Sequence, residues 1–181
     1  MYKFAPASDN ESVVFGSARP RYSHEQVKKW VEFMQAQGIQ RVCCLLTESH
    51  LRRYDRLLDV YRQAFGSDRI SWAPVEDFQL VDRGMAVHQI LPFLAAAEQS
   101  RERVVVHCSG GIGRTGHVLA AWLVAGRGFS SHSAITAVKA TGRNPYEAVI
   151  MAPFKGRNPW RVASELHSLL DDCSQLRKSL S

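Results

Sequence analysis

Val104 to Gly116, V-V-V-H-C-S-G-G-I-G-R-T-G, is the stretch of this chain that decides its fold. It opens with β-branched residues typical of a buried strand, passes through a loop of small residues, and continues into an apolar helical stretch from about Thr115 to Ala125. A glycine-rich turn between a strand and a helix lets successive backbone N–H groups converge on an anion, and the helix dipole adds to the attraction. The stretch therefore predicts a phosphate-binding loop after a central strand.

Two nucleotide-binding patterns share these glycines, and both fail on the residues that follow. Gly111, Gly113 and Gly116 satisfy G-x-G-x-x-G, but a dinucleotide site needs an acidic residue about 20 positions later, and residues 116–142 contain no Asp or Glu. The nucleoside-triphosphate loop needs Lys followed by Ser or Thr where His117 and Val118 stand. Neither pattern explains the stretch.

Cys108 and Arg114 supply chemistry that the nucleotide-binding patterns do not use. Arginine can grip two phosphate oxygens in a fork, a geometry that lysine cannot reproduce. The positive surroundings of such a loop favour the thiolate, which is the nucleophilic form of cysteine. The alternative is that Cys108 is a small buried residue at a strand end, but such a residue has no need of an arginine held six positions away by glycines.

Cleavage of a phosphate ester also requires an acid that gives a proton to the departing oxygen. Two candidates precede the loop, Asp77 at 31 positions and Asp82 at 26 positions before Cys108. Asp77 directly follows a predicted strand, which can fix its position, whereas Asp82 stands where a helix N-cap is expected. We therefore favour Asp77, and a solvated loop carboxylate is the alternative for each.

Apolar periodicity elsewhere predicts one α/β domain over residues 1–181. Strands are expected over residues 12–15, 41–46, 69–74 and 104–107, and helices over residues 23–38, 51–65, 84–99, 115–125, 131–141 and about 159–178. Pro92 predicts a kink in the helix expected over residues 84–99. Because strands alternate with helices, we expect a central, mostly parallel sheet flanked by helices on both faces.

The composition is that of an ordinary globular protein, because 45% hydrophobic and 22% charged residues exclude the fibrous and disordered classes. The net charge of +6 suits an anionic ligand, but the basic residues are scattered, so we expect no nucleic-acid partner. Cysteines at positions 43, 44, 108 and 173 form no C-x-x-C pair, which predicts no metal site and fits a reducing cytoplasm. We expect Cys43, Cys44 and Cys173 to be buried. Without a leader or a long apolar run, we expect no membrane partner.

The signature H-C, five residues, R-[S/T]-G resembles that of the cysteine-dependent dual-specificity phosphatases, and most of all the kinase-associated type. That type has G-I-Q, a buried strand, an L-x-x-Y helix, P-I-x-D and H-C-x-G-G-x-G-R-S in this order. The matching segments here, between about Gly16 and Gly142, are residues 38–40, the strand to Leu46, Leu51 with Tyr54, residues 74–77 and residues 107–115.

The resemblance implies a phosphatase that needs no metal or other cofactor. It implies that Cys108 attacks phosphorus to form a thiol-phosphate intermediate, and that Asp77 first protonates the leaving oxygen and then activates the water that releases phosphate. It also implies that the Thr115 hydroxyl assists the sulfur as leaving group. The phosphate oxygens would be held by Arg114 and by the amides of Ser109, Gly110, Gly111, Ile112 and Gly113.

Two supporting residues follow from the same resemblance. His107 is expected to orient the loop by hydrogen bonding without touching substrate, and Asn144 either helps to place the water or forms a turn. The tetrapeptide G-R-N-P occurs at residues 142–145 and 156–159, and we interpret it as turn chemistry because the surrounding residues do not match. Leu46 stands where the kinase-associated type has a cysteine that can pair with the nucleophile, so no protective disulfide is expected.

The substrate is predicted only as a class. Residues 109–113 contain no lysine, which argues against the highly charged phosphoinositide rings that basic loops favour. We expect a phosphorylated protein partner, with phosphotyrosine and phosphoserine or phosphothreonine both open, and a monomeric enzyme. The alternatives are a phosphatase of a small phosphorylated metabolite or of an RNA 5′-phosphate end, and a catalytically silent phosphopeptide-binding module.

Overall fold

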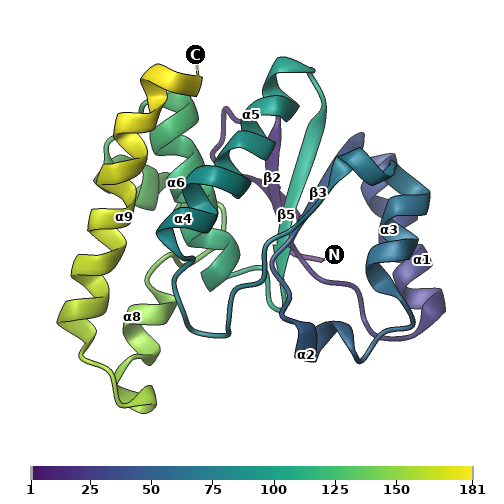
Figure 1. Ribbon diagram of the computed structural model, residues 1–181, viewed down its shortest axis with the longest axis horizontal. Coiled ribbons are helices and arrows are strands. Elements are labelled where there is room, and N and C mark those ends of the chain that lie inside the picture. The colour runs from purple at the N-terminus through teal and green to yellow at the C-terminus, as the bar shows by residue number, and fades with distance from the viewer. Residues whose placement is uncertain (1, 181) are drawn as a thin grey trace.

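A central five-stranded sheet organises the chain in the computed structural model, which describes residues 2–180 and the side chains up to residue 175. The strand order is β1-β2-β5-β3-β4, with bounds Ala5–Pro6 (β1), Val14–Ala18 (β2), Ile39–Cys44 (β3), Ile70–Trp72 (β4) and Arg103–Cys108 (β5). The pairings of β2 with β5, β5 with β3 and β3 with β4 are parallel, and β1 runs antiparallel to β2. The expected mostly parallel sheet is confirmed, with β5 at its centre (Figure 1).

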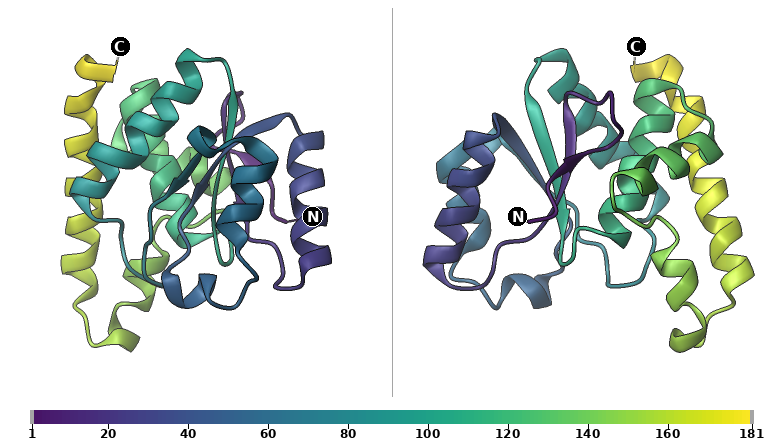
Figure 2. Two further views of the ribbon diagram at one scale, coloured as in Figure 1. Left: turned by 45° about the vertical axis from the view of Figure 1, so that its right-hand side comes forward. Right: turned by 180° about the vertical axis from the view of Figure 1, so that it is seen from behind.

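Helices cover both faces of the sheet, as expected (Figures 1 and 2). Their bounds are His24–Ala36 (α1), Glu48–Leu51 (α2), Leu57–Phe65 (α3), Arg83–Met85 (α4), Leu91–Gln99 (α5), Gly113–Arg127 (α6), Ser131–Ala140 (α7), Glu147–Met151 (α8) and Pro159–Leu180 (α9). Short 3-10 turns span Ser67–Arg69 and Pro153–Lys155. No helix within residues 2–180 has the length and the apolar character needed to cross a membrane.

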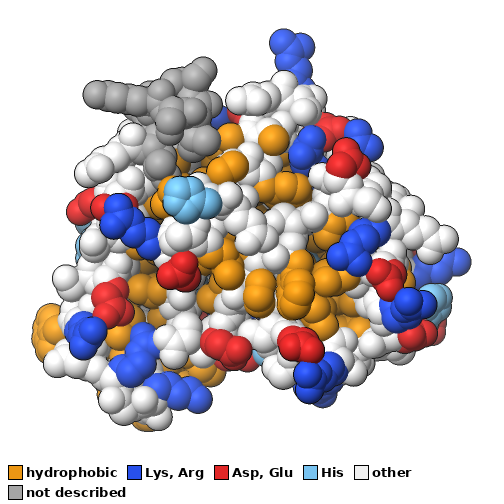
Figure 3. Space-filling model, in the orientation of Figure 1, with side chains coloured by type: hydrophobic (Ala, Val, Ile, Leu, Met, Phe, Trp, Pro, Cys, Tyr) orange, Lys and Arg blue, Asp and Glu red, His pale blue; other side chains and the backbone are white. Residues whose placement is uncertain are grey.

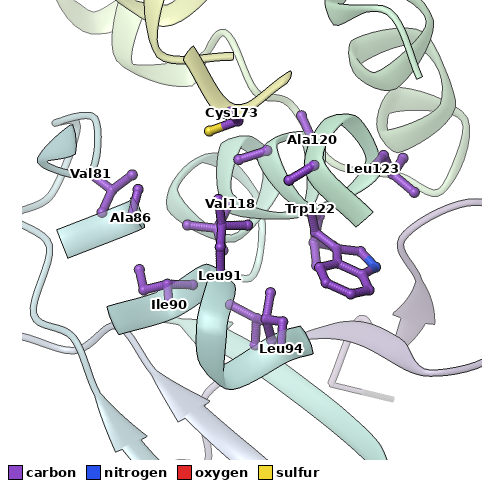
Figure 4. Packing of buried hydrophobic residues seen from close by; sticks show 14 of the residues in the cluster. Val81, Ala86, Ile90, Leu91, Leu94, Val118, Ala120, Trp122, Leu123 and Cys173 are labelled. Carbon is purple, nitrogen blue, oxygen red and sulfur yellow. The ribbon is translucent and has the colours of Figure 1, made fainter. Parts of the chain in front are cut away.

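The two faces of β5 supply two separate cores, because successive side chains of a strand point to opposite sides. Val104 and Val106 are buried in the larger cluster, with residues of α5, α6 and α9, whereas Val105 is buried in the cluster formed with α1 and α3. Figure 4 shows the larger cluster, where Leu91 and Leu94 lie close to Val118 and Trp122. Burial on both faces explains why β5 is a continuous apolar run.

The predicted ends of α1 are confirmed. The Ser23 hydroxyl oxygen accepts a hydrogen bond from the Gln26 amide at 3.3 Å, which satisfies one of the unpaired N–H groups of the first turn. The chain leaves the helix through Gly38, whose φ of +74° suits a residue without a side chain.

The single helix predicted over residues 51–65 is wrong, because the structure has two helices there. α2 ends at Leu51 and α3 begins at Leu57, and Arg56 between them adopts a left-handed conformation with φ of 55°. Tyr54 is buried in the intervening turn, where its hydroxyl donates to the Pro20 carbonyl at 2.8 Å. The apolar spacing that suggests one helix therefore comes from residues that reach the same core from different elements.

The helix predicted over residues 84–99 is irregular, as Pro92 indicated. A π-helical turn over Ala86–Ile90 joins α4 to α5 in one continuous run, and Pro92, which has no N–H to donate, follows this wider turn directly. The short helix α8 was not predicted, because five residues are too few to display a helical period.

Candidate functional site

Cys108 lies at the carboxyl end of the central strand, between two neighbours that fix its backbone. The Cys108 carbonyl accepts a hydrogen bond from the Arg19 amide at 2.9 Å, and the His107 carbonyl accepts one from the Leu45 amide at 2.9 Å. The Cys108 residue is only 2% exposed. The strand therefore delivers the thiol to the start of the glycine-rich loop with little freedom of movement.

The loop folds back over the sulfur of Cys108. The Gly111 amide donates a hydrogen bond to Sγ at 3.3 Å. Gly111 has a φ of +67°, and a Cβ at this position would lie 2.5 Å from the Ala18 nitrogen and 2.6 Å from the Ser17 carbonyl oxygen. Glycine is thus required here both by conformation and by space. One backbone donor of the loop thus points at the thiol, and the convergence of further amides on a phosphate stays a prediction.

Arg114 joins this loop to the segment that follows β4. Its guanidinium is 4% exposed, and Nη1 donates to the Val75 carbonyl at 2.8 Å. The Val75 amide in turn donates to the Leu45 carbonyl at 3.2 Å, which ties this segment to the end of β3. The other terminal nitrogen, Nη2, contacts the Asp77 carboxylate. Arg114 therefore has one terminal nitrogen on a neutral carbonyl and one on an acid.

The structure brings Asp77, and not Asp82, to the loop. The Asp77 side chain is 44% exposed and contacts Arg114 as well as His50 Nε2, which lies 3.2 Å from Oδ2. The Asp82 carboxylate accepts a hydrogen bond from the Met85 amide at 3.0 Å and caps α4, as the sequence indicated. The Asp77 carboxylate thus lies at the loop, whereas the Asp82 carboxylate serves as a helix cap.

His50 was missed by sequence reasoning. It lies on α2, and its Nδ1 is 2.7 Å from the Thr47 hydroxyl, which orients the ring toward Asp77. Burial lowers the pKa of His50, and the positive charge of Arg114 acts in the same direction, whereas the Asp77 charge opposes both. No pattern in the sequence points to this residue, because a histidine on a short helix far from the motif resembles any surface histidine.

His107 is fully buried beside the loop and does not face solvent. Its ring packs edge-on against Trp30 and Tyr61, with ring centroids 5.2 and 5.7 Å apart. Neither ring nitrogen makes a hydrogen bond of normal geometry within residues 2–175. Burial lowers the pKa of His107 to about 3. Aromatic packing thus holds the ring beside the loop, and a hydrogen bond from His107 that orients the loop stays a prediction.

His117 connects α6 to the segment that carries the two acids. Its Nε2 accepts a hydrogen bond from the Val81 amide at 3.0 Å, so this nitrogen carries no proton. Burial lowers the pKa of His117 to about 3, and Arg114 contributes in the same direction. In the sequence, His117 only excluded a nucleoside-triphosphate loop. In the structure it also holds the backbone at Val81.

The hydroxyl groups of Ser109 and Thr115 are buried in the loop region. Neither oxygen has a hydrogen-bond partner among the described residues. Buried polar groups of this kind are rare in proteins unless a ligand, a water molecule or a reacting group satisfies them.

Gly113, at the start of α6, has the Glu147 carboxylate packed against it, so a side chain at this position would collide.

Arg143 is a second buried arginine behind the loop. It is 3% exposed, donates to the Thr141 carbonyl at 2.9 Å and to the Lys3 carbonyl at 2.8 Å, and lies beside Thr115. Burial lowers the pKa of Arg143 to about 10, while the nearby charge of Cys108 opposes this shift. No carboxylate within the described side chains pairs with it. The sequence offered only the G-R-N-P turn as a signal.

Both G-R-N-P segments are turns that open helices, which confirms their interpretation as turn chemistry. The Asn144 side-chain oxygen accepts from the Tyr146 amide at 3.2 Å, just before α8. The Asn158 oxygen accepts from the Trp160 amide at 2.9 Å and from the Arg161 amide at 3.3 Å, at the start of α9. Of the two roles expected for Asn144, the structure exhibits the turn.

The other cysteines are buried, as predicted. Burial raises the pKa of the Cys44 thiol to about 12 and that of Cys173 to about 11, and it raises the pKa of Cys43 further. All three are neutral thiols at neutral pH and pack as small apolar residues.

A family model matches this chain over residues 22–149, and its description is dual specificity phosphatase, catalytic domain. The match includes the Cys108 loop, Arg114 and Asp77, and it ends within α8. No curated protein sequence matches the chain.

Solved structures share the fold at low sequence identity. Tk-PTP in its active form is 23% identical, with a TM-score of 0.67, 90% of this chain covered and 97% of that one. A kinase-associated phosphatase with its catalytic-site cysteine replaced by serine is 22% identical, with a TM-score of 0.63 and coverage of 79% and 85%. PTPMT1 in complex with PI(5)P is 14% identical, with a TM-score of 0.69 and coverage of 95% and 97%. At these identities the likeness concerns the fold.

Proposed function

This chain belongs to the dual-specificity phosphatase family, and we propose that it hydrolyses phosphate monoesters on proteins through a cysteine nucleophile. The observation that carries the proposal is the meeting of three groups at one loop. The Gly111 amide donates to the Cys108 sulfur, Arg114 stands in the first turn of the following helix, and Asp77 reaches across to Arg114. These are the nucleophile, the anion-binding group and the acid that phosphoryl transfer through cysteine requires.

In the first step the phosphate binds to the loop amides of residues 109–113, and the Arg114 nitrogen that contacts Asp77 turns to a phosphate oxygen. The Cys108 thiolate attacks phosphorus, forms the S–P bond, and displaces the substrate oxygen, which takes a proton from Asp77. The loop amides, the α6 N-terminus and Arg114 stabilise the charge on the equatorial oxygens.

In the second step water replaces the departed alcohol. Asp77, now ionised, accepts a proton from this water as it attacks phosphorus, the S–P bond breaks, and the sulfur leaves as thiolate. The Thr115 hydroxyl, which has no other partner among the described residues, is available to donate to the departing sulfur. Asn144 contributes through its turn, because its oxygen is already bonded to the Tyr146 amide.

A phosphoprotein is the substrate class that we propose. The absence of lysine from residues 109–113 disfavours a highly charged inositol ring, and a related fold, TpbA of P. aeruginosa, has been solved in complex with pTyr. PTPMT1 in complex with PI(5)P makes a phosphoinositide the main competitor. A reducing cytoplasm suits the enzyme, since the reaction requires a free thiolate.

The first test replaces the nucleophile. We expect Cys108→Ser to lower kcat for p-nitrophenyl phosphate by at least about 10³-fold, because a serine hydroxyl is not ionised at neutral pH. Binding of inorganic phosphate, measured by calorimetry, should persist. Cys173→Ala, which removes a buried thiol from α9, is the control and should retain turnover. Hydrolysis by Cys108→Ser at the control rate would refute the assignment.

The second test compares the two acids by isosteric replacement. Asp77→Asn should lower kcat by about 10²-fold for a phosphoserine peptide, whose alkoxide needs a proton, and by much less for p-nitrophenyl phosphate. Asp82→Asn should retain activity, because asparagine also caps a helix well. Steady-state phosphate release on both substrates measures this. A large loss with Asp82→Asn alone would assign the acid to Asp82.

The third test concerns His50, which we expect to hold Asp77 in position once Arg114 has turned to the phosphate. His50→Phe should lower kcat for the phosphoserine peptide by roughly tenfold, since a small misplacement of a reacting group is costly. His50→Gln should restore most of it, because its side-chain amide can donate to Asp77. In an Asp77→Asn background the His50→Phe change should have no further effect. An undiminished loss in that background would mean that His50 acts only on folding.

The fourth test addresses the substrate class. Phosphate release from phosphotyrosine, phosphoserine and phosphothreonine peptides should give a kcat/KM at least about tenfold above that for phosphatidylinositol phosphates or 5′-phosphorylated RNA. A higher value for either competitor would transfer the proposal to that class. Failure to release phosphate from every substrate, with retained phosphate binding, would favour the silent binding module.

A further inference from the structure

Large hydrophobic side chains are exposed on one small part of the surface. Within the described side chains, those with high exposure are Ile150 at 56%, Phe154 at 78% and Trp160 at 83%, with Trp72 elsewhere at 37%. Three of these four lie on the segment from α8 to the start of α9, residues 150–161, which we call the tip. Figure 1 shows the tip at the lower left of the molecule, and Figure 3 shows orange side chains beside blue ones in the same region. Scattered exposed apolar residues are normal, but a cluster marks an interaction site.

The tip is a built structure with an inner and an outer face. On its inner face Ala152 is buried in a small apolar cluster with Ala148 and Val162, which flank the tip. The Arg157 amide donates to the Ala152 carbonyl at 2.9 Å, and Gly156 closes the turn with a φ of +67°. Phe154 and Trp160 are exposed because they lie on the outer face of this ordered turn, so their exposure does not reflect a loosened segment.

Basic side chains surround the exposed aromatic ones. Lys155 lies over the Phe78 ring at 5.5 Å and Arg157 bonds to the neutral Gln79 side chain, so neither has an acidic partner among the described residues. Arg161 pairs with Glu165 at 3.0 Å. The tip thus combines protruding aromatic side chains with uncompensated positive charge.

We propose that the tip docks on an anionic lipid bilayer. Aromatic side chains prefer the boundary between headgroups and acyl chains, and basic residues beside them are attracted to anionic headgroups. Three side chains are too few for a stable protein interface, which buries about 800 Å² on each partner. A lipid surface needs no matching shape and takes up single protruding rings. The positive charge of Lys155 and Arg157 selects an anionic membrane over a neutral one.

The same contacts would orient the enzyme on that surface. Phe78 and Gln79, which touch Lys155 and Arg157, directly follow Asp77, so the tip borders the segment that closes over Cys108. In Figure 1 the tip projects toward the same end of the molecule as the carboxyl ends of the strands. Docking would therefore bring the pocket close to phosphate groups presented at the membrane. This differs from the expectation, drawn from the missing apolar segments, that no membrane partner exists.

The test measures binding without turnover, so it does not depend on the proposed phosphatase activity. The Cys108→Ser protein is sedimented with vesicles of phosphatidylcholine, with and without phosphatidylserine. We expect binding to the anionic vesicles that weakens as salt is raised, and little binding to phosphatidylcholine alone. Absence of binding to the anionic vesicles at low salt would overturn the proposal.

Two variants of that protein locate the contact. Phe154→Ser with Trp160→Ser should reduce vesicle binding at least about tenfold, and Lys155→Gln with Arg157→Gln roughly fivefold for each charge removed. The control, Arg52→Gln with Arg62→Gln, removes two exposed cations, one directly after α2 and one on α3, and should bind as the parent does. Equal losses in control and charge variants, or undiminished binding of the aromatic variant, would refute the tip as the docking site. Self-association in ultracentrifugation that the aromatic variant abolishes would assign the tip to a second copy instead.

Discussion

The hydrogen bond from Arg114 Nη1 to the Val75 carbonyl is the constraint on which the site depends. It joins the first turn of α6 to the segment after β4, two parts of the chain that are 39 residues apart in sequence. Val75 is fixed in turn by its amide bond to Leu45 at the end of β3. Asp77 follows Val75 by two residues. The end of β3 therefore positions this acid beside the loop that connects β5 to α6. A neutral carbonyl holds one terminal nitrogen of the guanidinium, and the other contacts Asp77, which is the nitrogen that the proposed mechanism turns to a phosphate oxygen.

Positive charge at the loop comes from groups that burial does not discharge. Arg114 and Arg143 are both almost fully buried, and Arg143 retains its proton at neutral pH although burial lowers its pKa to about 10. His107 and His117 are also buried nearby, but burial lowers the pKa of each to about 3, so both are neutral at neutral pH. His107 therefore contributes by packing and His117 by accepting a hydrogen bond, while the arginines and the helix N-terminus supply the positive charge.

Local patterns predicted the parts of the fold and site that depend on local physics. The strand before Cys108, the loop and the helix after it follow from β-branched, glycine and apolar residues in sequence, and the distinction between Asp77 and Asp82 followed from a strand end and an N-cap. The break between Leu51 and Leu57 was not predictable in this way, because the residues on both sides of it reach one core and imitate a single helical period. His50 and Arg143 were missed for a different reason. Their surroundings are assembled from segments distant in sequence, and no spacing within either segment records the partner.

Helix α9, which lies beyond the family match, belongs to the core, whereas the connection that leads into it from α8 exposes apolar side chains. The match ends at residue 149, yet Leu166, Leu169, Leu170 and Cys173 of α9 are buried in the same cluster as α6, the helix that begins at the loop. Removal of α9 would uncover this apolar face, so the helix belongs to the core and supports the position of Arg114 indirectly. The connection from α8 to α9 lies beyond the end of the sheet in Figure 1. The exposed apolar residues of that connection could have been polar without loss to the core, and Phe154 and Trp160 are the places where the sequence departs from what folding alone requires.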